Sequence, residues 1–328
     1  MVEKLRKKQG SELNVTEQTA SQKVAKELFR KAAEATSVGK VRKVFREVKE
    51  ALKENRISNT VAYSALMTLG GNCEQLYQEK KSKEVLKLAA EVYGKAAECA
   101  KRESSKAKCL ALKAMALSQL TADEDLDPEE RAQYWENAAY ALKDAFHLNR
   151  KEIVDLSFAG RTHHITQSDT NTMLRRAAVM YMEKGEEEQK KFVREHSEKA
   201  RECYISAYRC AIKAGDVKLA ATAIEKVPSS YRLLVLAETL QEESISIELR
   251  KQLIPLLRDS ALHYTDLGIY WGVIDPDAIA NKFFSIMDGA YQSVRDPSLK
   301  QAIKDIEEDV MNTEGREYLK KYYYERNE

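Results

Sequence analysis

The sequence predicts an all-α protein made of stacked antiparallel helical hairpins. Apolar residues recur at helical spacing in almost every segment after residue 20, and we find no sustained alternation of apolar and polar residues of the kind that marks β-strands. Glycines and Asp-Pro pairs divide this pattern into short helices. With 328 residues, the chain is long enough for one elongated domain or two compact ones.

The domain organisation follows from where the helical pattern begins. Residues 1–20 are polar and aperiodic, which predicts a flexible N-terminal segment. Residues 21–328 are then expected to form one helical-repeat domain, with a sub-boundary near 160–168 or 228–230. The array is expected to end in a tighter helical bundle after residue 230.

The first expected hairpin joins a helix over 22–35 to a helix over 40–54. The link Ser37-Val38-Gly39 is short, so the two helices must pack antiparallel. Apolar residues of the second helix follow the i, i+3, i+4, i+7 spacing of one buried stripe. They are Val41, Val44, Phe45, Val48, Ala51 and Leu52.

Prolines and glycines predict where later helices begin and end. An aspartate side chain caps free N–H groups and proline suits the first helical turn, so Asp-Pro pairs mark helix starts. They are Asp127-Pro128, Asp275-Pro276 and Asp296-Pro297. Glycine adopts the left-handed conformation that ends a helix. Turns are therefore expected at Gly39, Gly70-Gly71, Gly160, Gly185, Gly215 and Gly315.

Burial is expected to be uneven along the chain. The segment 84–120 is apolar on more than one face and rich in alanine, which predicts helices covered on two sides. The segment 186–202 is densely charged, with opposite charges four residues apart, which predicts a solvated helix extension.

Cysteine usage and targeting signals indicate the cytosol, with the nucleus as an alternative. The five cysteines are widely spaced, form no Cys-x-x-Cys pair and have no histidine at zinc-finger spacing, which predicts buried thiols and no metal site. They are Cys73, Cys99, Cys109, Cys203 and Cys210. No segment is apolar enough to predict a membrane span, and the first residues lack the apolar core of a secretory signal.

One segment resembles a tetratricopeptide or pentatricopeptide hairpin. It runs from Cys203 to Pro228, with Gly215 in a Gly-Asp turn, Ala220 as the small residue after that turn and Pro228 at its end. A second segment, 44–67, looks pentatricopeptide-like. The resemblance implies an α-solenoid that binds partners on an extended surface. Pentatricopeptide proteins read RNA with polar residues near the start of the first helix, where this sequence has Ala65.

No catalytic or nucleotide-binding motif is present, so the sequence predicts neither an enzyme nor a cofactor. The longest polar insert between strong helices, Gly160–Asp169, contains the pair His163-His164. We expect a surface turn that ends in a helix cap at Ser168 or Asp169. A functional loop is the alternative, because rigid scaffolds often carry functional residues on such loops.

Charge is concentrated near the N-terminus. The whole chain has a net charge of +2, whereas residues 1–56 contain 15 Lys/Arg and eight Asp/Glu. On the two helices of the first hairpin, basic residues form two rows at helical spacing. They are Lys23, Lys26 and Arg30 on the first helix, and Arg42, Arg46, Lys49 and Lys53 on the second. If the rows come together, they form a cationic patch for an acidic or phosphorylated partner or for RNA; an ordinary solvated face is the alternative.

A tyrosine cluster ends the chain: Tyr318, Tyr322, Tyr323 and Tyr324. Tyr318 and Tyr322 are i, i+4 neighbours with Leu319 beside them, which predicts a helix that seals the last apolar face of the array. Exposed tyrosines that anchor a partner are the alternative.

Together these features predict a non-enzymatic protein-interaction scaffold or adaptor in the cytosol, which binds a protein or peptide through Lys23, Lys26, Arg30, Arg42, Arg46, Lys49 and Lys53. Two alternatives stay open. One is an RNA-binding repeat protein that uses the basic N-terminal hairpin, and the other is an all-helical enzyme whose site no motif reveals.

Overall fold

The computed structural model describes residues 21–123, 125–149, 153–191, 194–270 and 275–327. The segment 1–20, for which the sequence predicts flexibility, lies outside them. Contacts divide the chain into two compact units, Met1–Met173 and Leu174–Glu328. The expected sub-boundaries near 160–168 or 228–230 stay predictions. Among the described residues, no helix combines the length and the apolar character that crossing a membrane requires.

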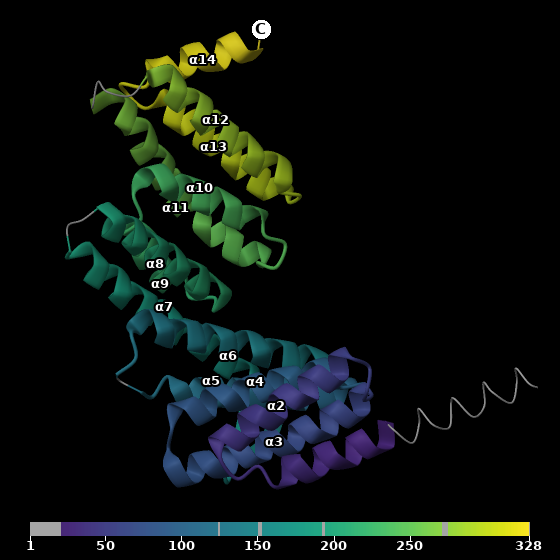
Figure 1. The fold of residues 1–328 in the computed structure, drawn as a ribbon. Helices are drawn as coiled ribbons and strands as arrows, with labels where there is room; N and C mark the ends of the chain where they lie inside the picture. The colour runs from purple at the N-terminus through teal and green to yellow at the C-terminus, as the bar shows by residue number, and fades with distance from the viewer. Residues whose placement is uncertain (1–20, 124, 150–152, 192–193, 271–274, 328) are drawn as a thin grey trace, which may run out of the picture. The chain divides into compact units, whose positions relative to one another are not determined.

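The described residues are mostly helical, which confirms the all-α fold class (Figure 1). Up to the hairpin, the helices are residues 21–33, α2 (Val38–Lys53), α3 (Asn59–Lys80), α4 (Lys83–Cys99), α5 (Glu103–Leu120) and α6 (Pro128–Asn149). A hairpin of β1 (Ile153–Phe158) and β2 (Arg161–Thr166) follows. The later helices are α7 (Gln167–Gln189), α8 (Arg194–Lys213), α9 (Val217–Glu225), α10 (Ser229–Gln241), α11 (Ile247–Tyr270), α12 (Pro276–Ser293), α13 (Pro297–Asn312) and α14 (Glu317–Asn327).

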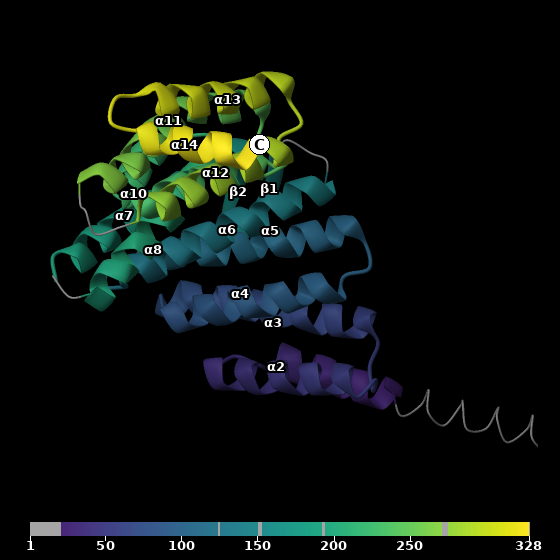
Figure 2. The same cartoon turned by 90° about the horizontal axis from the view of Figure 1, so that it is seen from above.

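In the first unit, each helix from α2 to α6 packs against the next one in the chain. Figure 2 shows these helices as successive layers, as expected for stacked hairpins. Alanines fill much of the interface, and Ala65, Ala96 and Ala111 are each fully buried. These small side chains let neighbouring helix backbones approach closely, and they explain the burial on two sides that the sequence predicts for 84–120.

In the second unit, helices also contact the next but one. The pairs α8–α9 and α10–α11 pack together, and α10 also contacts α12 while α11 contacts α13. The last helix, α14, packs on α12 and α13.

The three Asp-Pro helix starts are confirmed at α6, α12 and α13. In each case an Oδ1 of the aspartate accepts a backbone N–H of the first turn. The acceptors and donors are Asp127 with Glu129 N at 2.9 Å, Asp275 with Asp277 N at 3.0 Å, and Asp296 with Leu299 N at 2.9 Å.

Three of the expected glycine turns are confirmed. Gly160, Gly215 and Gly315 have φ values of 76°, 70° and 82°, in the left-handed region that side chains disfavour. Gly215 lies between α8 and α9, as predicted, and the Asp216 side chain caps α9 by accepting from Leu219 N.

The other expected glycine turns are wrong, because Gly39, Gly70, Gly71 and Gly185 all lie inside helices. Two of them are there for packing. A Cβ on Gly70 would lie 2.4 Å from the ring of Tyr93, and one on Gly185 would lie 2.5 Å from the ring of Tyr204. These glycines make room for a buried aromatic ring of the following helix, a role that the sequence alone does not distinguish from a turn.

The hairpin of β1 and β2 corrects the expectation of a surface turn over 160–169. The strands pair antiparallel from Ile153 with Thr166 to Phe158 with Arg161. Ala159 and Gly160 form the two-residue loop with positive φ values of 49° and 76°, the geometry that closes tight hairpins. Leu156, Phe158 and Ile165 are buried, and β1 packs against α5. The sequence carried this information in the alternation Leu156-Ser157-Phe158 before Ala159-Gly160.

His163 and His164 both lie on β2, so the histidine pair belongs to a strand and not to a loop. His164 Nδ1 lies 2.6 Å from Asp155 Oδ1 of β1, and both side chains are exposed. Ser168 and Asp169 lie in the first turn of α7 instead of at its cap, and Asp169 Oδ2 accepts the backbone N–H of Thr166 at 2.7 Å.

The expected helix extension over 186–202 is also wrong, because α7 ends at Gln189 and α8 begins at Arg194. The segment is not wholly solvated either. Glu188 is only 2% exposed, and its carboxylate lies 3.1 Å from Lys184 Nζ and 2.9 Å from Lys191 Nζ. A buried carboxylate needs such partners, which the charge pattern alone did not reveal.

All five cysteines are free and buried, as the sequence predicts. Burial raises the pKa of the Cys73 thiol to about 12 and that of Cys109 to about 11. Because the thiolate is the reactive form, burial disfavours the reactive form of both thiols at neutral pH.

The C-terminal tyrosine helix seals the last apolar face, as predicted. Leu319 of α14 is fully buried, and the Tyr322 ring stacks on Phe284 of α12 with centroids 5.9 Å apart. The Tyr318 hydroxyl donates to the Thr265 carbonyl oxygen of α11 at 2.9 Å. Tyr324, by contrast, is exposed.

A lysine groove as the candidate functional site

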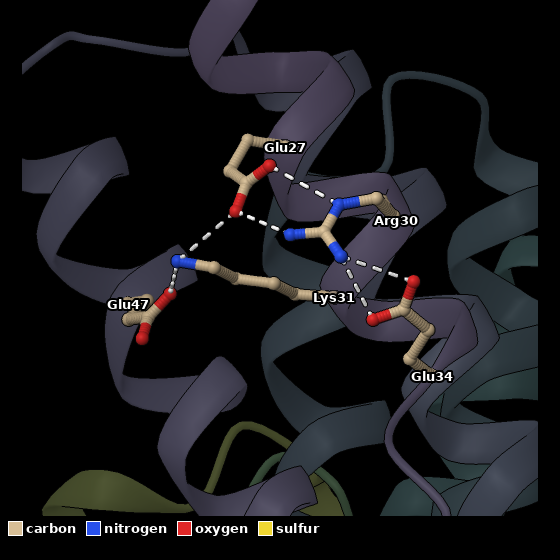
Figure 3. Close-up of polar contacts among 5 residues, drawn as sticks. All are labelled: Glu27, Arg30, Lys31, Glu34 and Glu47. Carbon is tan, nitrogen blue, oxygen red and sulfur yellow. Dashed lines mark hydrogen bonds and ion pairs between the residues drawn. The ribbon is translucent and has the colours of Figure 1, made fainter.

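Several basic residues of the first hairpin are bound into ion pairs (Figure 3). Arg30 lies between Glu27 and Glu34, with nitrogen–oxygen distances of 2.8 Å and 3.0 Å. Lys31 joins the first helix to α2, because its Nζ lies 2.9 Å from Glu47 Oε2. The bond from Arg30 lowers the pKa of Glu27, and the bond to Glu47 raises the pKa of Lys31.

Two members of the row on α2, Arg42 and Lys49, lie beside α4. Arg42 Nη2 lies 3.3 Å from Glu84 Oε2 at the start of α4. Further along α2, the Lys49 ammonium lies 5.2 Å from the centroid of the Phe45 ring, within cation–π distance. The remaining basic residues of the two rows are exposed and have no ion-pair partner within the described ranges. They are Lys23, Lys26, Arg46 and Lys53.

The two rows contribute to different hollows. Lys23 lines a hollow of about 440 Å³ between the first helix and α2, together with Glu27, Glu47 and Glu50. Lys49 lines another hollow, between α2 and α4. The assignment of the seven basic residues to partner binding stays a prediction.

The hollow next to Lys49 is a groove of about 560 Å³, which we call the lysine groove. Its charged lining consists of Lys49 from α2, Lys87, Glu91, Lys95 and Glu98 from α4, and Lys113 from α5. Its apolar and aromatic lining includes Phe45, Leu117, Leu120 and Tyr134. The groove therefore joins four lysines and two glutamates to an apolar wall.

Lys87 is held by α6. Its Nζ donates to Glu130 Oε1 at 2.7 Å and lies 5.5 Å from the centroid of the Tyr134 ring. The Tyr134 hydroxyl donates to the same oxygen at 2.6 Å. The bond to Glu130 raises the pKa of Lys87, and the bond from Lys87 lowers the pKa of Glu130, so this pair is ionised at neutral pH.

Lys95 is paired within its own helix. Its ammonium donates to Glu98 Oε2 at 2.5 Å, three residues along α4, and this bond raises the pKa of Lys95. Glu91, one turn before Lys95, is exposed.

Lys113 reaches the groove by crossing α4. A Cβ placed on Gly94 would meet Lys113 Cδ, Cε and Nζ at 3.6, 3.8 and 3.9 Å. The lysine side chain therefore lies over Gly94, which has no side chain of its own. Lys113 is half-buried. Its ammonium has no carboxylate or aromatic partner in the described part of the chain.

The basic rows in the sequence include Lys49 of this groove but not Lys87, Lys95 or Lys113. One observation could have revealed two of them: Lys87, Glu91 and Lys95 follow at intervals of four on α4, so they form a charged stripe in an otherwise apolar segment. Lys113 is the single charged residue between Cys109 and Leu120 of α5, and only the fold shows that it lies beside this stripe.

Metal-ligating residues do not gather in this unit or elsewhere in the described ranges: no three His, Cys, Asp or Glu side chains there lie as a metal ion would require.

Comparisons with known proteins add little to this picture. No protein-family model matches the chain, and no curated protein does. A solved structure described as "Circular tandem repeat protein with novel repeat topology and enhanced subunit contact surfaces" is 15% identical, with a TM-score of 0.28, and the match covers 89% of this chain and 71% of that one. The assignment to stacked helical hairpins rests on the helices and contacts described above.

Proposed function

We propose that this protein is a non-enzymatic interaction scaffold of the cytosol, and that its first unit binds an acidic segment of a partner protein in the lysine groove. The observation that carries the proposal is the composition of the groove, in which four lysines from three helices surround an apolar wall. An extended surface between stacked helices is the usual binding surface of helical-repeat proteins.

The chemistry of the groove favours a peptide over a nucleic acid. Nucleic acids are bound by rows of cations that each neutralise a phosphate, whereas here two of the four lysines already have a carboxylate partner. A mixed wall of Phe45, Leu117 and Tyr134 with lysines around it suits a segment that carries both apolar and acidic side chains.

A binding experiment with a charge-reversal variant tests the proposal. The probe is a dye-labelled peptide in which leucines alternate with glutamates, and the readout is fluorescence anisotropy on the full chain. We expect Lys49→Glu combined with Lys113→Glu to weaken binding by about tenfold or more, because two attractive charges become repulsive.

The matched control is Lys43→Glu combined with Lys108→Glu. These lysines lie on the same two helices, are exposed and lie outside the groove, and their substitution changes the net charge equally. We expect the control to bind like the wild type. An equal loss in both variants would show a general charge effect and contradict the proposal, as would tight binding of a polyuridine probe that the groove variant leaves intact.

A further inference from the structure

We propose that the lysine groove recognises a carboxylate side chain, Glu or Asp, that lies next to an apolar side chain in one short segment, and that Lys113 is the residue that pairs with the carboxylate. This inference deepens the proposed function and rests on it. It names the anchor within the groove and the chemistry of the segment that the anchor selects.

Lys113 differs from the other groove lysines in its partners. Lys87 lies 2.7 Å from Glu130 and Lys95 lies 2.5 Å from Glu98, so their charges are largely balanced within the fold. Lys49 lies over the Phe45 ring. Lys113 alone among the four has neither a carboxylate nor an aromatic partner within the described ranges, and its charge is therefore available to a ligand.

The position of Lys113 makes its charge effective. The side chain is half-buried and lies across Gly94, so its outer atoms have fewer accessible conformations than those of a lysine that extends into water. An ion pair formed at a half-buried site is less screened than one on an open surface. Less side-chain entropy is lost on binding when the side chain is already held in place.

The apolar part of the proposed ligand follows from the other wall of the groove. Phe45, Leu117 and Tyr134 line the same hollow as Lys113. At about 560 Å³, the hollow has the size of a pocket for a small ligand and takes a few side chains of a short segment. An apolar side chain seated there removes hydrocarbon surface from water while its acidic neighbour reaches Lys113.

A carboxylate fits this environment better than a phosphate. A phosphorylated side chain carries about −1.5 to −2 charges at neutral pH, whereas the single lysine proposed as the anchor supplies one positive charge. Glu91 and Glu98 also line the groove and repel a second negative charge. The lining contains no arginine, whose planar fork binds phosphate oxygens in pairs.

Four dye-labelled peptides in one Gly/Ser background test the inference on the full chain by fluorescence anisotropy. They carry a central Leu-Glu, Leu-Gln, Ala-Glu or Leu-phosphoserine pair. For the wild type, we expect Leu-Glu to bind about tenfold more tightly than Leu-Gln and also more tightly than Ala-Glu.

Lys113→Gln should abolish the preference for Leu-Glu over Leu-Gln but keep the preference for leucine over alanine. The conservative variant Lys113→Arg should keep both preferences, since it retains the charge. Lys108→Gln, on the same helix but outside the groove, is the matched control and should behave like the wild type. Unchanged circular dichroism and urea midpoints would show that each variant folds.

The outcomes separate this inference from the proposed function. If the wild type binds none of the peptides, the proposed function itself fails. If the wild type prefers Leu-Glu and Lys113→Gln keeps that preference, the groove binds acidic segments but Lys113 is not the anchor. Tighter binding of the phosphoserine peptide than of Leu-Glu would overturn the assignment to a carboxylate.

Discussion

Tyr93 in the first unit and Tyr204 in the second occupy equivalent local environments. Each ring lies against a glycine inside the preceding helix, Gly70 for Tyr93 and Gly185 for Tyr204. Each hydroxyl donates to the side chain four residues after that glycine, which is Glu74 in the first unit and Gln189 in the second, the latter at 3.0 Å. The same packing arrangement thus occurs once in each unit.

The two arrangements differ in the charge of the acceptor side chain and in the number of groups that donate to it. Gln189 is neutral, and the Tyr204 ring is additionally covered by the Lys226 ammonium, 5.6 Å from its centroid. Glu74 is a carboxylate, and its second oxygen accepts the backbone N–H of Ala159 at 2.9 Å. Glu74 therefore connects three elements, α3, α4 and the loop of the β-hairpin, whereas Gln189 connects two, α7 and α8, among the residues that the structure describes.

The difference shows that the same glycine–tyrosine packing can join two successive helices in one unit and also connect residues far apart in the sequence in the other. In both units the glycine provides room for the ring. In the first unit the acceptor also holds the loop of the β-hairpin in place, so losing a partner there leaves a half-buried carboxylate without its donor.

The largest expected effect is that of filling the space under the ring. Gly70→Ala should lower the free energy of unfolding by about 3 kcal/mol, because the new Cβ would lie 2.4 Å from the buried Tyr93 ring and force it to move. Gly71→Ala is the matched control, since no neighbouring side chain or other part of the fold lies within 4 Å of its Cβ position. It should stabilise the protein by up to about 1 kcal/mol through helix propensity. Urea unfolding measures both. Equal stability of the two variants would disprove the packing role of Gly70.

Removing the two hydroxyls compares the acceptors directly. Tyr93→Phe should cost about 2 kcal/mol, because the Glu74 carboxylate loses a donor in a half-buried site. Tyr204→Phe should cost about 1 kcal/mol, since its acceptor is a neutral amide. Urea unfolding measures both variants. A larger loss of unfolding free energy for Tyr204→Phe than for Tyr93→Phe would contradict the expected difference between the two acceptors.

A third glycine, Gly215, is required by its backbone conformation and not by the packing of a neighbouring ring. Gly215 has a φ of 70° and open space around its Cβ position, so it differs from Gly70 and Gly185 in the reason for being glycine. Gly215→Val should destabilise by about 1–2 kcal/mol, because a β-branched residue disfavours the left-handed region. Gly289→Ala, in α12 and also with open space, should be neutral or slightly stabilising. A valine variant with an unchanged melting temperature would contradict this assignment.

The smallest expected effect appears only at alkaline pH. Burial raises the pKa of both Tyr93 and Tyr204 above the usual value of about 10, so the folded protein retains protons that the unfolded chain loses. Below that pH the contribution to stability is fully present; above it, the free energy of unfolding falls as pH rises toward the folded-state pKa. Tyr93→Phe should flatten this decline in urea unfolding curves measured across the alkaline range. A decline of unchanged slope would assign it to other groups.

The sequence predicts an element correctly where residues close to it in the chain are enough to determine its structure. Spacing of Val41, Val44, Phe45 and Val48 predicts the buried face of α2, and an Asp-Pro pair defines the start of α6 without knowledge of any neighbour. The turn at Gly215 follows from its Gly-Asp dipeptide in the same way. These predictions need only the chain within a few residues.

The sequence was uninformative wherever a distant residue decides. Gly70 and Gly185 have the appearance of helix ends, and only the rings of Tyr93 and Tyr204 show why they are helical. The lysine groove is of this kind too, because Lys113 comes to lie beside the α4 stripe only through the stacking of α5 on α4. The alternation of apolar and polar residues in the β-hairpin is visible in the sequence, but each strand has only six residues and lies between two long helices. So short an alternation does not by itself predict strands in a chain with a helical pattern on both sides.

The bond from Ala159 to Glu74 joins residues 85 positions apart in the chain, and this separation has a consequence for the order of folding. Contacts of long sequence separation form late, because closing the intervening loop costs entropy before the contact contributes. During synthesis, α3 and α4 emerge and pair well before the hairpin exists, and Glu74 first meets only Tyr93. We therefore expect the amide of Ala159, although it lies in a hairpin loop, to gain protection from hydrogen exchange as one of the last events in the first unit. Its protection would report that this unit has finished folding.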